Sequence, residues 1–419
     1  MKPAAVLHPI RPARRLDGVT YDIRGPLHAR ALDLEDAGQS VLRLNIGNPG
    51  RFGFEVPQHL REAMARTIPA SESYGHQQGL IEAREAIAAV QQSRGVPGTH
   101  PNRVFIGNGV SELIDVCLRA LLHEGDEVLV PSPDYPLWTA AVHLNGGVPV
   151  HYPCRPENGA LPDPTEIEAR VSKRTRALVL INPNNPTGAV YPKELVEDIV
   201  RIAERHGLVL FTDEIYEALL FGGAEFTPAA PFCHGTLCVT MSGLSKVHRA
   251  CGWRVGWASL SGAVERAKDY LQALDLLTAL RLCSNVPGQQ TIVPALTGPD
   301  TWTALCQPGG RLYDTRAAVL AGIADSPYLS LAAPMGAMYA FPGVDTQAIP
   351  DFDDARFALD LLEEKRILVV PGSSFNVPYR NHFRITLLPE AAVMRRVFRE
   401  IDDLLATYAA RQLPQAAVA

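Results

Sequence analysis

A single lysine near the middle of the chain has neighbours that suit covalent amine chemistry. Lys246 follows Val239-Thr-Met-Ser-Gly-Leu-Ser245, an apolar run that ends in small, hydroxyl-bearing residues. Eight positions after the lysine, Arg254 stands between Trp253 and Val255 in a second apolar segment. An isolated lysine is ordinarily a solvated surface charge. These surroundings favour a covalent role for the amine.

Four other polar segments directly follow short runs of aliphatic residues. Five such runs occur, at residues 104–106, 127–130, 177–181, 208–211 and 237–241, and longer helical periods separate them. This alternation is typical of βαβ units and of a parallel sheet that is buried on both faces. Such sheets bind ligands at the carboxyl ends of their strands. We therefore expect the residues after the runs to converge on one crevice.

The first two of these segments suit a phosphate and a flat ring. Gly107-Asn-Gly109-Val-Ser111 forms a glycine turn into a helix, which offers free amides and a hydroxyl to a phosphate. The alternative is a structural turn with a serine N-cap. Tyr135 lies in a proline-stiffened loop, where its ring could stack on a heterocycle or pack in the core.

The next two segments place hydrogen-bonding groups in apolar surroundings. The loop Asn182-Pro-Asn-Asn185-Pro-Thr-Gly188 presents amides that can donate to a phenolate-type oxygen, although Asn-Pro repeats also form plain turns. Asp213 follows a run apolar enough to bury it, and a buried carboxylate needs a cation or donors. A protonated pyridine nitrogen could be that cation, with Tyr216 on the same face. A helix N-cap is the alternative for Asp213.

In combination these segments resemble the class I and II aminotransferases, the fold-type-I enzymes that use pyridoxal 5′-phosphate. The resemblance runs from about Tyr21 to the C-terminal helix. Its motifs are NPNNPTG (182–188), DEIY (213–216), SGLSK with Arg254 (242–254) and FRIT (383–386). It implies an α/β fold with a mostly parallel seven-stranded sheet between helices, plus a smaller α+β domain. We expect an N-terminal arm and part of the small domain over 1–52, a large cofactor-binding domain over 53–294 and a small C-terminal domain over 295–419.

The resemblance also implies roles for individual residues. Lys246 would link covalently to the cofactor and carry the substrate proton, Asp213 would keep the pyridine nitrogen protonated, and Tyr216 would hydrogen-bond the phenolic oxygen. Gly243 stands where many relatives have a serine, which leaves open the serine that contacts the phosphate. The implied cofactor-binding residues are Gly109, Val110, Ser111, Tyr135, Asn185, Asp213, Tyr216, Ser242, Ser245, Lys246, Arg254 and, from a neighbouring subunit, Tyr74.

For the substrate, the resemblance is greatest to the bacterial alanine aminotransferases, which pair alanine and pyruvate with glutamate and 2-oxoglutarate. The segments YDIRGPL (21–27), IGNPGRFGF (46–54), LRLCSNVP (280–287) and GGRLYDTR (309–316) carry it. It implies a ping-pong reaction in a homodimer with active sites at the subunit interface. The implied substrate-binding residues are Gly47, Asn185 and Arg384, with Arg24 and Arg281 as candidates for the distal carboxylate of glutamate.

Other activities on the same scaffold stay open at this point. An aminotransferase of other small or branched amino acids, or a pyridoxal-phosphate-dependent C–S β-lyase, would use the same residue types. A transcriptional regulator with an aminotransferase-like module is disfavoured, because only about 20 residues precede Tyr21.

The composition is that of a protein that handles small polar molecules. Among 419 residues, 39 Lys and Arg against 45 Asp and Glu give a net charge of −6, so no basic surface for nucleic acid or anionic membrane is expected. The seven cysteines are scattered without a CxxC pair, which favours reduced thiols over a disulfide framework or a metal site. No signal peptide and no apolar run long enough to span a membrane is recognisable. We expect a cytoplasmic enzyme without metal.

Overall fold

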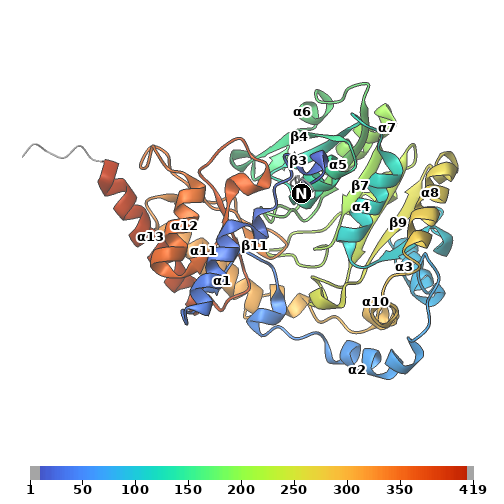
Figure 1. Cartoon of the computed structure of the whole chain (residues 1–419), viewed down its shortest axis with the longest axis horizontal. Coiled ribbons are helices and arrows are strands. Elements are labelled where there is room, and N and C mark those ends of the chain that lie inside the picture. The colour runs from blue at the N-terminus through green and yellow to red at the C-terminus, as the bar shows by residue number, and fades with distance from the viewer. Residues whose placement is uncertain (1–9, 413–419) are drawn as a thin grey trace, which may run out of the picture.

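The computed structural model describes residues 10–412, and an eight-stranded sheet forms the centre of its larger part (Figure 1). The spatial order is β2-β9-β8-β7-β6-β3-β4-β5. The strands are β2 Val104–Gly107, β3 Glu127–Ser132, β4 Val148–Arg155, β5 Leu161–Pro162, β6 Thr175–Ile181, β7 Val209–Asp213, β8 Leu237–Gly243 and β9 Gly256–Gly262. Strands β8, β7, β6, β3 and β4 run parallel, whereas β9 is antiparallel to β2 and β8, and β5 is antiparallel to β4.

All five apolar runs form strands, which confirms the predicted mostly parallel sheet. The expected count of seven strands is one too low, because β5 adds an eighth strand at the edge. This strand has only two residues and pairs with β4 through the turn at Pro156–Asn158. It is too short to form an apolar run that would be recognised in the sequence.

Alternate side chains of the central strands pack on opposite faces of the sheet. In β6, Ala177, Val179 and Ile181 join one hydrophobic core, and Leu178 and Leu180 join another. The first core includes residues of α4 Val110–Leu121, α5 Leu137–Leu144 and α8 Lys268–Leu280, and the second includes α7 Lys193–His206. Burial on both faces explains why the apolar runs in these strands are continuous instead of alternating with polar residues.

Further α-helices complete this part of the molecule. The remaining α-helices here are α2 Gln58–Thr67, α3 Ile81–Ser93, α6 Pro164–Glu168, α9 Val286–Gln289 and α10 Ile292–Thr297. Single 3-10 turns occur throughout the described chain, at Arg14–Leu16, Asp22–Arg24, Pro49–Phe52, Ile68–Ala70, Pro101–Arg103, Pro156–Asn158, Ala230–Phe232, Cys251–Trp253, Val264–Arg266, Thr303–Cys306 and Gly372–Phe375.

The C-terminal part packs helices against short strands and takes in the start of the chain. Its helices are α11 Arg311–Asp325, α12 Asp354–Lys365 and α13 Ala391–Gln412, and the N-terminal helix α1 Pro26–Asp36 lies among them (Figure 1). Its strands are β1 Leu42–Arg43, β10 Leu329–Ser330, β11 Tyr339–Ala340, β12 Gly343–Val344, β13 Ile367–Leu368, β14 Val370–Pro371 and β15 Phe383–Thr386.

The parallel pairing of β1 with β13 joins the segment after α1 to the C-terminal part. The domain boundaries at residues 52/53 and 294/295 nevertheless stay a prediction. The expected N-terminal arm and small domain also extend to residues 1–9 and 413–419, which lie outside the described range. From residue 10 to residue 412, no helix is both long enough and apolar enough to cross a membrane.

Candidate active site

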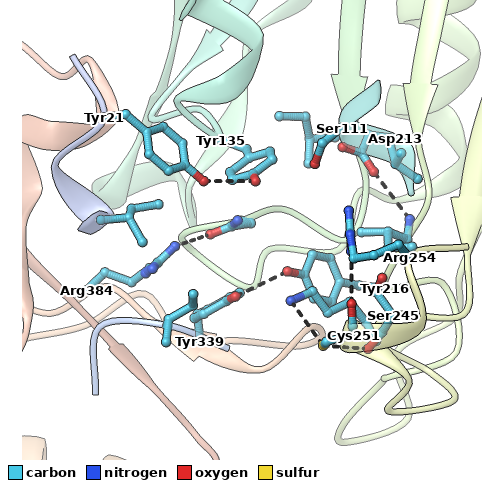
Figure 2. Close-up of a pocket in the computed structure, with 17 residues that line it drawn as sticks. Tyr21, Ser111, Tyr135, Asp213, Tyr216, Ser245, Cys251, Arg254, Tyr339 and Arg384 are labelled. Carbon is cyan, nitrogen blue, oxygen red and sulfur yellow. Dashed lines mark hydrogen bonds between the residues drawn. The ribbon is translucent and has the colours of Figure 1, made fainter. Parts of the chain in front are cut away.

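Ten of the residues singled out from the sequence line one pocket of about 150 Å³ at the carboxyl edge of the sheet (Figure 2). The strands explain this convergence: Asp213 ends β7, Asn185 follows β6, Tyr135 follows β3 and Val110 begins the helix after β2. The ten residues are Val110, Ser111, Tyr135, Asn185, Asp213, Tyr216, Ser245, Lys246, Arg254 and Arg384.

Asp213 is a buried carboxylate with only long hydrogen bonds. Its side chain accepts from Trp138 Nε1 at 3.3 Å and from the Ile215 amide at 3.4 Å, and the residue is 3% exposed. Burial raises the pKa of Asp213 to about 6, against the opposing effects of these two donors and of Lys246. A turn rather than a helix follows it, so it is not an N-cap. The carboxylate is suited to receive a cationic group of a ligand.

Lys246 enters the pocket from the loop after β8. Its Nζ donates to the Gly47 carbonyl at 2.8 Å and lies 4.0 Å from Cys251 Sγ. Burial acts to lower the pKa of this amine, but the facing acidic groups of Tyr339 and Cys251 outweigh burial and raise it. The loop folds back through a bond from the Leu244 amide to the Val255 carbonyl at 3.1 Å. Because the loop folds back in this way, Lys246, Cys251 and Arg254 all line the pocket.

Arg254 and the start of α4 form a cradle at one end of the pocket. Gly109 is the N-cap of α4 with φ +88°, and a Cβ at this position would lie 2.2 Å from Arg254 Nη2. Only glycine tolerates both this backbone conformation and this close approach. Ser111 and Ser245 line the same pocket, and Ser111 is not the N-cap. The amides at the helix start, the hydroxyls and the guanidinium form a site suited to a phosphate.

Arg384 is a buried guanidinium with one unused donor. It is 1% exposed, donates from Nη1 to Asn185 Oδ1 at 2.9 Å and from Nη2 to the Asn45 carbonyl at 2.5 Å. Its Nε has no hydrogen-bond partner among residues 10–412. No carboxylate of the described chain pairs with it. A carboxylate ligand would supply the missing negative charge.

Tyr135 and Tyr21 close another side of the pocket. Their hydroxyls lie 3.0 Å apart and their rings meet edge to face at 6.4 Å. Burial raises the pKa of Tyr135 well above its ordinary value, so its hydroxyl stays neutral. Tyr135 therefore has the pocket position expected for a ring that contacts a ligand, although part of its side chain also packs against the core.

Two residues expected from the sequence lie outside the lining of this pocket. Ser242 does not reach it, because it is buried inside β8 opposite Trp257, so Ser245 is the serine that the fold presents. Arg281 does not line it either, because its side chain pairs with Glu112 at 3.1 Å and donates to the Ile106 carbonyl at 2.8 Å.

Three further residues that were expected to bind the cofactor or the substrate also lie outside the pocket lining. Arg24 is exposed at the end of a 3-10 turn and does not line the pocket. Tyr74 is 80% exposed and also lies away from it, as a residue expected to serve a neighbouring subunit can. Gly47 contributes its carbonyl to Lys246 rather than a pocket surface.

Sequence reasoning missed seven lining residues: Tyr21, Ile23, Ile46, Ile181, Ile215, Cys251 and Tyr339. It also missed Trp138, whose Nε1 donates a hydrogen bond to the Asp213 carboxylate but which does not line the pocket. Cys251 could have been found from its position five residues after Lys246. The aliphatic residues and Tyr339 carry no local signal, since they look like core residues.

Comparisons with known proteins agree with this geometry. The family model for aminotransferase class I and II matches residues 39–401. The glutamate-pyruvate aminotransferase AlaA of Haemophilus influenzae is 45% identical over 94% of this chain and 98% of its own. The alanine aminotransferase of Mycobacterium tuberculosis (strain H37Rv) is 42% identical over 94% of this chain and 92% of its own. The crystal structure of an aminotransferase from Escherichia coli has a TM-score of 0.94 at 44% identity and covers 97% of this chain and 100% of its own.

Proposed function

Because this chain belongs to the class I and II aminotransferases, we propose that it moves an amino group between alanine or pyruvate and glutamate or 2-oxoglutarate in a ping-pong reaction. The alanine and glutamate-pyruvate aminotransferases that it resembles over more than nine-tenths of its length support this substrate pair. The observation that carries the proposal is one pocket in which Lys246 lies with a buried carboxylate, Asp213, and a buried guanidinium, Arg384.

The pocket residues fit pyridoxal 5′-phosphate as the cofactor. The buried Asp213 suits a protonated ring nitrogen, and the cradle at Gly109 and Arg254 suits the phosphate. Asn185 and Tyr216 would face the phenolic oxygen, and Lys246 would hold the aldehyde covalently. When bound, pyridoxal phosphate supplies a protonated ring that withdraws electrons and stabilises negative charge on the α-carbon of the amino acid.

Arg384 would bind the α-carboxylate of the incoming amino acid. Its guanidinium offers a planar pair of donors, and its Nε is already desolvated and without a partner in the described chain. The bond from Nη1 to Asn185 Oδ1 aligns the amide with this arginine. An amino acid held by its carboxylate is then confined to the pocket that Lys246 lines.

Once the amino group of the substrate has displaced it from the cofactor, Lys246 Nζ would take the proton from the substrate α-carbon and deliver it to the former aldehyde carbon, C4′, of the cofactor. The Gly47 carbonyl, 2.8 Å away, orients this amine. Ile23, Ile46 and Ile181 line the pocket and exclude water from the proton transfer.

The proposal includes a homodimer in which Tyr74 of one subunit contacts the phosphate in the other. Tyr74 is exposed in the single chain, and so are Leu276, Leu280 and Leu282 near the end of α8, at 62%, 75% and 53%. Such apolar exposure supports a subunit interface in this region. Arg24 and Arg281 remain proposed ligands of the distal carboxylate of glutamate, although neither lines the pocket of the single subunit. The boundaries at residues 52/53 and 294/295 are likewise proposed.

A cytoplasmic location is also part of the proposal. All seven cysteines are free thiols, and five of them are buried. Free thiols suit a reducing compartment.

A half-reaction panel tests the proposed function. The purified protein is loaded with pyridoxal phosphate, and the loss of its visible absorbance is followed after adding each amino acid separately. Alanine and glutamate should react fastest, and branched amino acids more slowly. Release of pyruvate and ammonia from cystathionine without any amino acceptor would instead identify a C–S β-lyase. A protein that takes up no pyridoxal phosphate would refute the proposal.

A further inference from the structure

Tyr339 is a pocket residue that contacts both the substrate side and the cofactor side of the site. It lies in β11, whose antiparallel partner β15 carries Arg384. The register pairs Tyr339 with Thr386, so Arg384, two residues before Thr386, lies diagonally opposite on the same face. The Arg384 guanidinium carbon is 4.3 Å from the Tyr339 ring and 4.8 Å from the Phe375 ring. Two aromatic rings therefore hold this buried cation.

The hydroxyl of Tyr339 extends to the opposite side of the pocket. Tyr216 Oη donates to Tyr339 Oη at 3.3 Å, and the rings meet edge to face at 5.9 Å. Figure 2 shows Tyr339 between Arg384 and Tyr216. A Cβ on Gly47 would lie 2.2 Å from Tyr339 Oη, so the hydroxyl packs directly on the segment whose carbonyl holds Lys246.

The two tyrosines differ in acidity. Burial acts to raise the pKa of Tyr339, but the charges of Lys246 and Arg384 and the Tyr216 bond bring it below its ordinary value. Burial raises the pKa of Tyr216 well above its ordinary value. Tyr216 is the donor of their hydrogen bond in this structure, and the cations Lys246 and Arg384 make Tyr339 the more acidic of the two hydroxyls. Once the Tyr216 hydrogen is engaged by another acceptor, Tyr339 can donate to the Tyr216 oxygen.

We propose that Tyr339 is a positioning residue for transamination: its ring holds Arg384 in place, and its hydroxyl extends a hydrogen-bond chain that acts through Tyr216. This inference rests on the proposed function, because Tyr216 needs the phenolic oxygen of pyridoxal phosphate as its acceptor. A donor to the Tyr216 oxygen polarises the Tyr216 hydroxyl and strengthens the bond that Tyr216 makes. Tyr339 thereby contacts both Arg384, which would bind the substrate carboxylate, and Tyr216, which would hydrogen-bond the phenolic oxygen of the cofactor.

The hydroxyl is tested by titrating the visible absorbance of the loaded protein with pH, without substrate. Negative charge on the phenolic oxygen holds the proton on the nitrogen that joins Lys246 to the cofactor, and donors to that oxygen weaken this hold. Tyr339→Phe should therefore raise the titration midpoint, by about half a pH unit. Tyr216→Phe should raise it further, and the double variant should match Tyr216→Phe alone, because the effect passes through Tyr216.

Tyr152→Phe is the matched control. Tyr152 is also a buried tyrosine, but its hydroxyl donates to the Val179 carbonyl at 2.7 Å, away from the pocket. Its midpoint should equal that of the wild type. An unchanged midpoint in Tyr339→Phe, or additive shifts in the double variant, would overturn the proposed chain.

The ring is tested by the change in KM. Tyr339→Leu removes the aromatic contact and should raise KM for alanine about tenfold with a smaller change in kcat, whereas Tyr339→Phe should change KM less than about twofold. Equal KM values for Tyr339→Phe and Tyr339→Leu would refute the role of the ring. If Tyr339→Leu does not fold, the titration of Tyr339→Phe still decides the role of the hydroxyl.

The outcomes separate this inference from the proposed function. If the wild type shows no visible absorbance with pyridoxal phosphate, both are overturned. If the wild-type absorbance titrates normally and Tyr339→Phe titrates identically, only the role of the Tyr339 hydroxyl is overturned.

Discussion

The sheet side of the pocket and the side formed by the C-terminal part carry opposite buried charges. Asp213 ends a central strand and accepts only long hydrogen bonds, at 3.3 and 3.4 Å. Arg384 lies in a four-residue strand, contacts two aromatic rings and has an Nε without a partner in the described chain. Each charge is destabilising when the pocket contains only protein, so each needs an oppositely charged ligand group. The pocket therefore fits a bound pair of molecules, with a cation towards Asp213 and a carboxylate towards Arg384.

The two sides also differ in how they are held. Asp213 is held by main-chain pairing to β6 and β8, and Trp138 supports its carboxylate. Arg384 depends on side chains and backbone from distant segments, namely Asn185, Asn45, Tyr339 and Phe375. The Asp213 side of the pocket is thus set mainly by the sheet, and the Arg384 side mainly by packing between segments.

The largest effect is expected where the two sides meet, at Lys246. Lys246→Ala should reduce kcat by at least about 10⁴-fold and abolish both visible absorbance and any borohydride-fixed adduct, since no other amine lines the pocket in the described chain. Lys193→Ala is the control, because Lys193 is exposed on α7 and pairs with Glu197. Retained steady-state turnover in Lys246→Ala would contradict the assignment.

On the sheet side, Asp213→Asn should lower kcat by about 10³-fold, because a neutral amide does not hold a ring nitrogen protonated. Absorbance titration should also show weaker cofactor binding. Asp198→Asn, at an exposed position of α7, should behave like the wild type. If Asp213→Asn and the wild type had equal cofactor affinity and equal kcat, the negative charge of Asp213 would have no role in binding the cofactor or in catalysis.

On the Arg384 side, Arg384→Lys should lower kcat/KM for alanine by about 10²-fold, because lysine lacks the paired donors of the guanidinium. Cofactor affinity should stay within a factor of about two, which separates this side from the Asp213 side. Arg380→Lys is the control, since Arg380 is exposed and pairs with Asp353. If Arg384→Lys lost the cofactor instead, the two sides would not be separable.

The smallest effect concerns the stability of the cofactor-free protein. The folded-state pKa of Asp213 is about 6 and its ordinary value is 3.8, so folding favours the protonated form. That stabilisation is present below pH 4 and is lost as the pH rises through 6, and the loss amounts to at most about 3 kcal/mol. Denaturant unfolding should therefore show that Asp213→Asn gains stability relative to the wild type between pH 4 and pH 7. If the difference in unfolding free energy between Asp213→Asn and the wild type did not change with pH, the Asp213 carboxylate would not be buried and unpaired.

The Asp213 side of the pocket was largely predictable from the chain. Asn185, Asp213 and Lys246 follow or end apolar runs, and all three line the pocket. Ser242 lies outside the pocket lining, because the strand continues to Gly243 and keeps that serine inside the sheet. The choice between Ser242 and Ser245 depended on where β8 ends, which the run of hydrophobic residues does not define.

The pattern of apolar runs was enough to predict the central strands of the sheet and the carboxyl edge where its polar residues gather. Long apolar runs must be buried on both faces, and parallel strands end on the same side. That Tyr339, Tyr21 and Ile46 line the pocket, and that Glu112 pairs with Arg281, could be seen only in the folded protein. An aromatic or aliphatic residue has the same local pattern in a pocket wall as in a core, and a charge does not reveal its partner along the chain. Those assignments follow from contacts between distant segments, which exist only once the chain has folded.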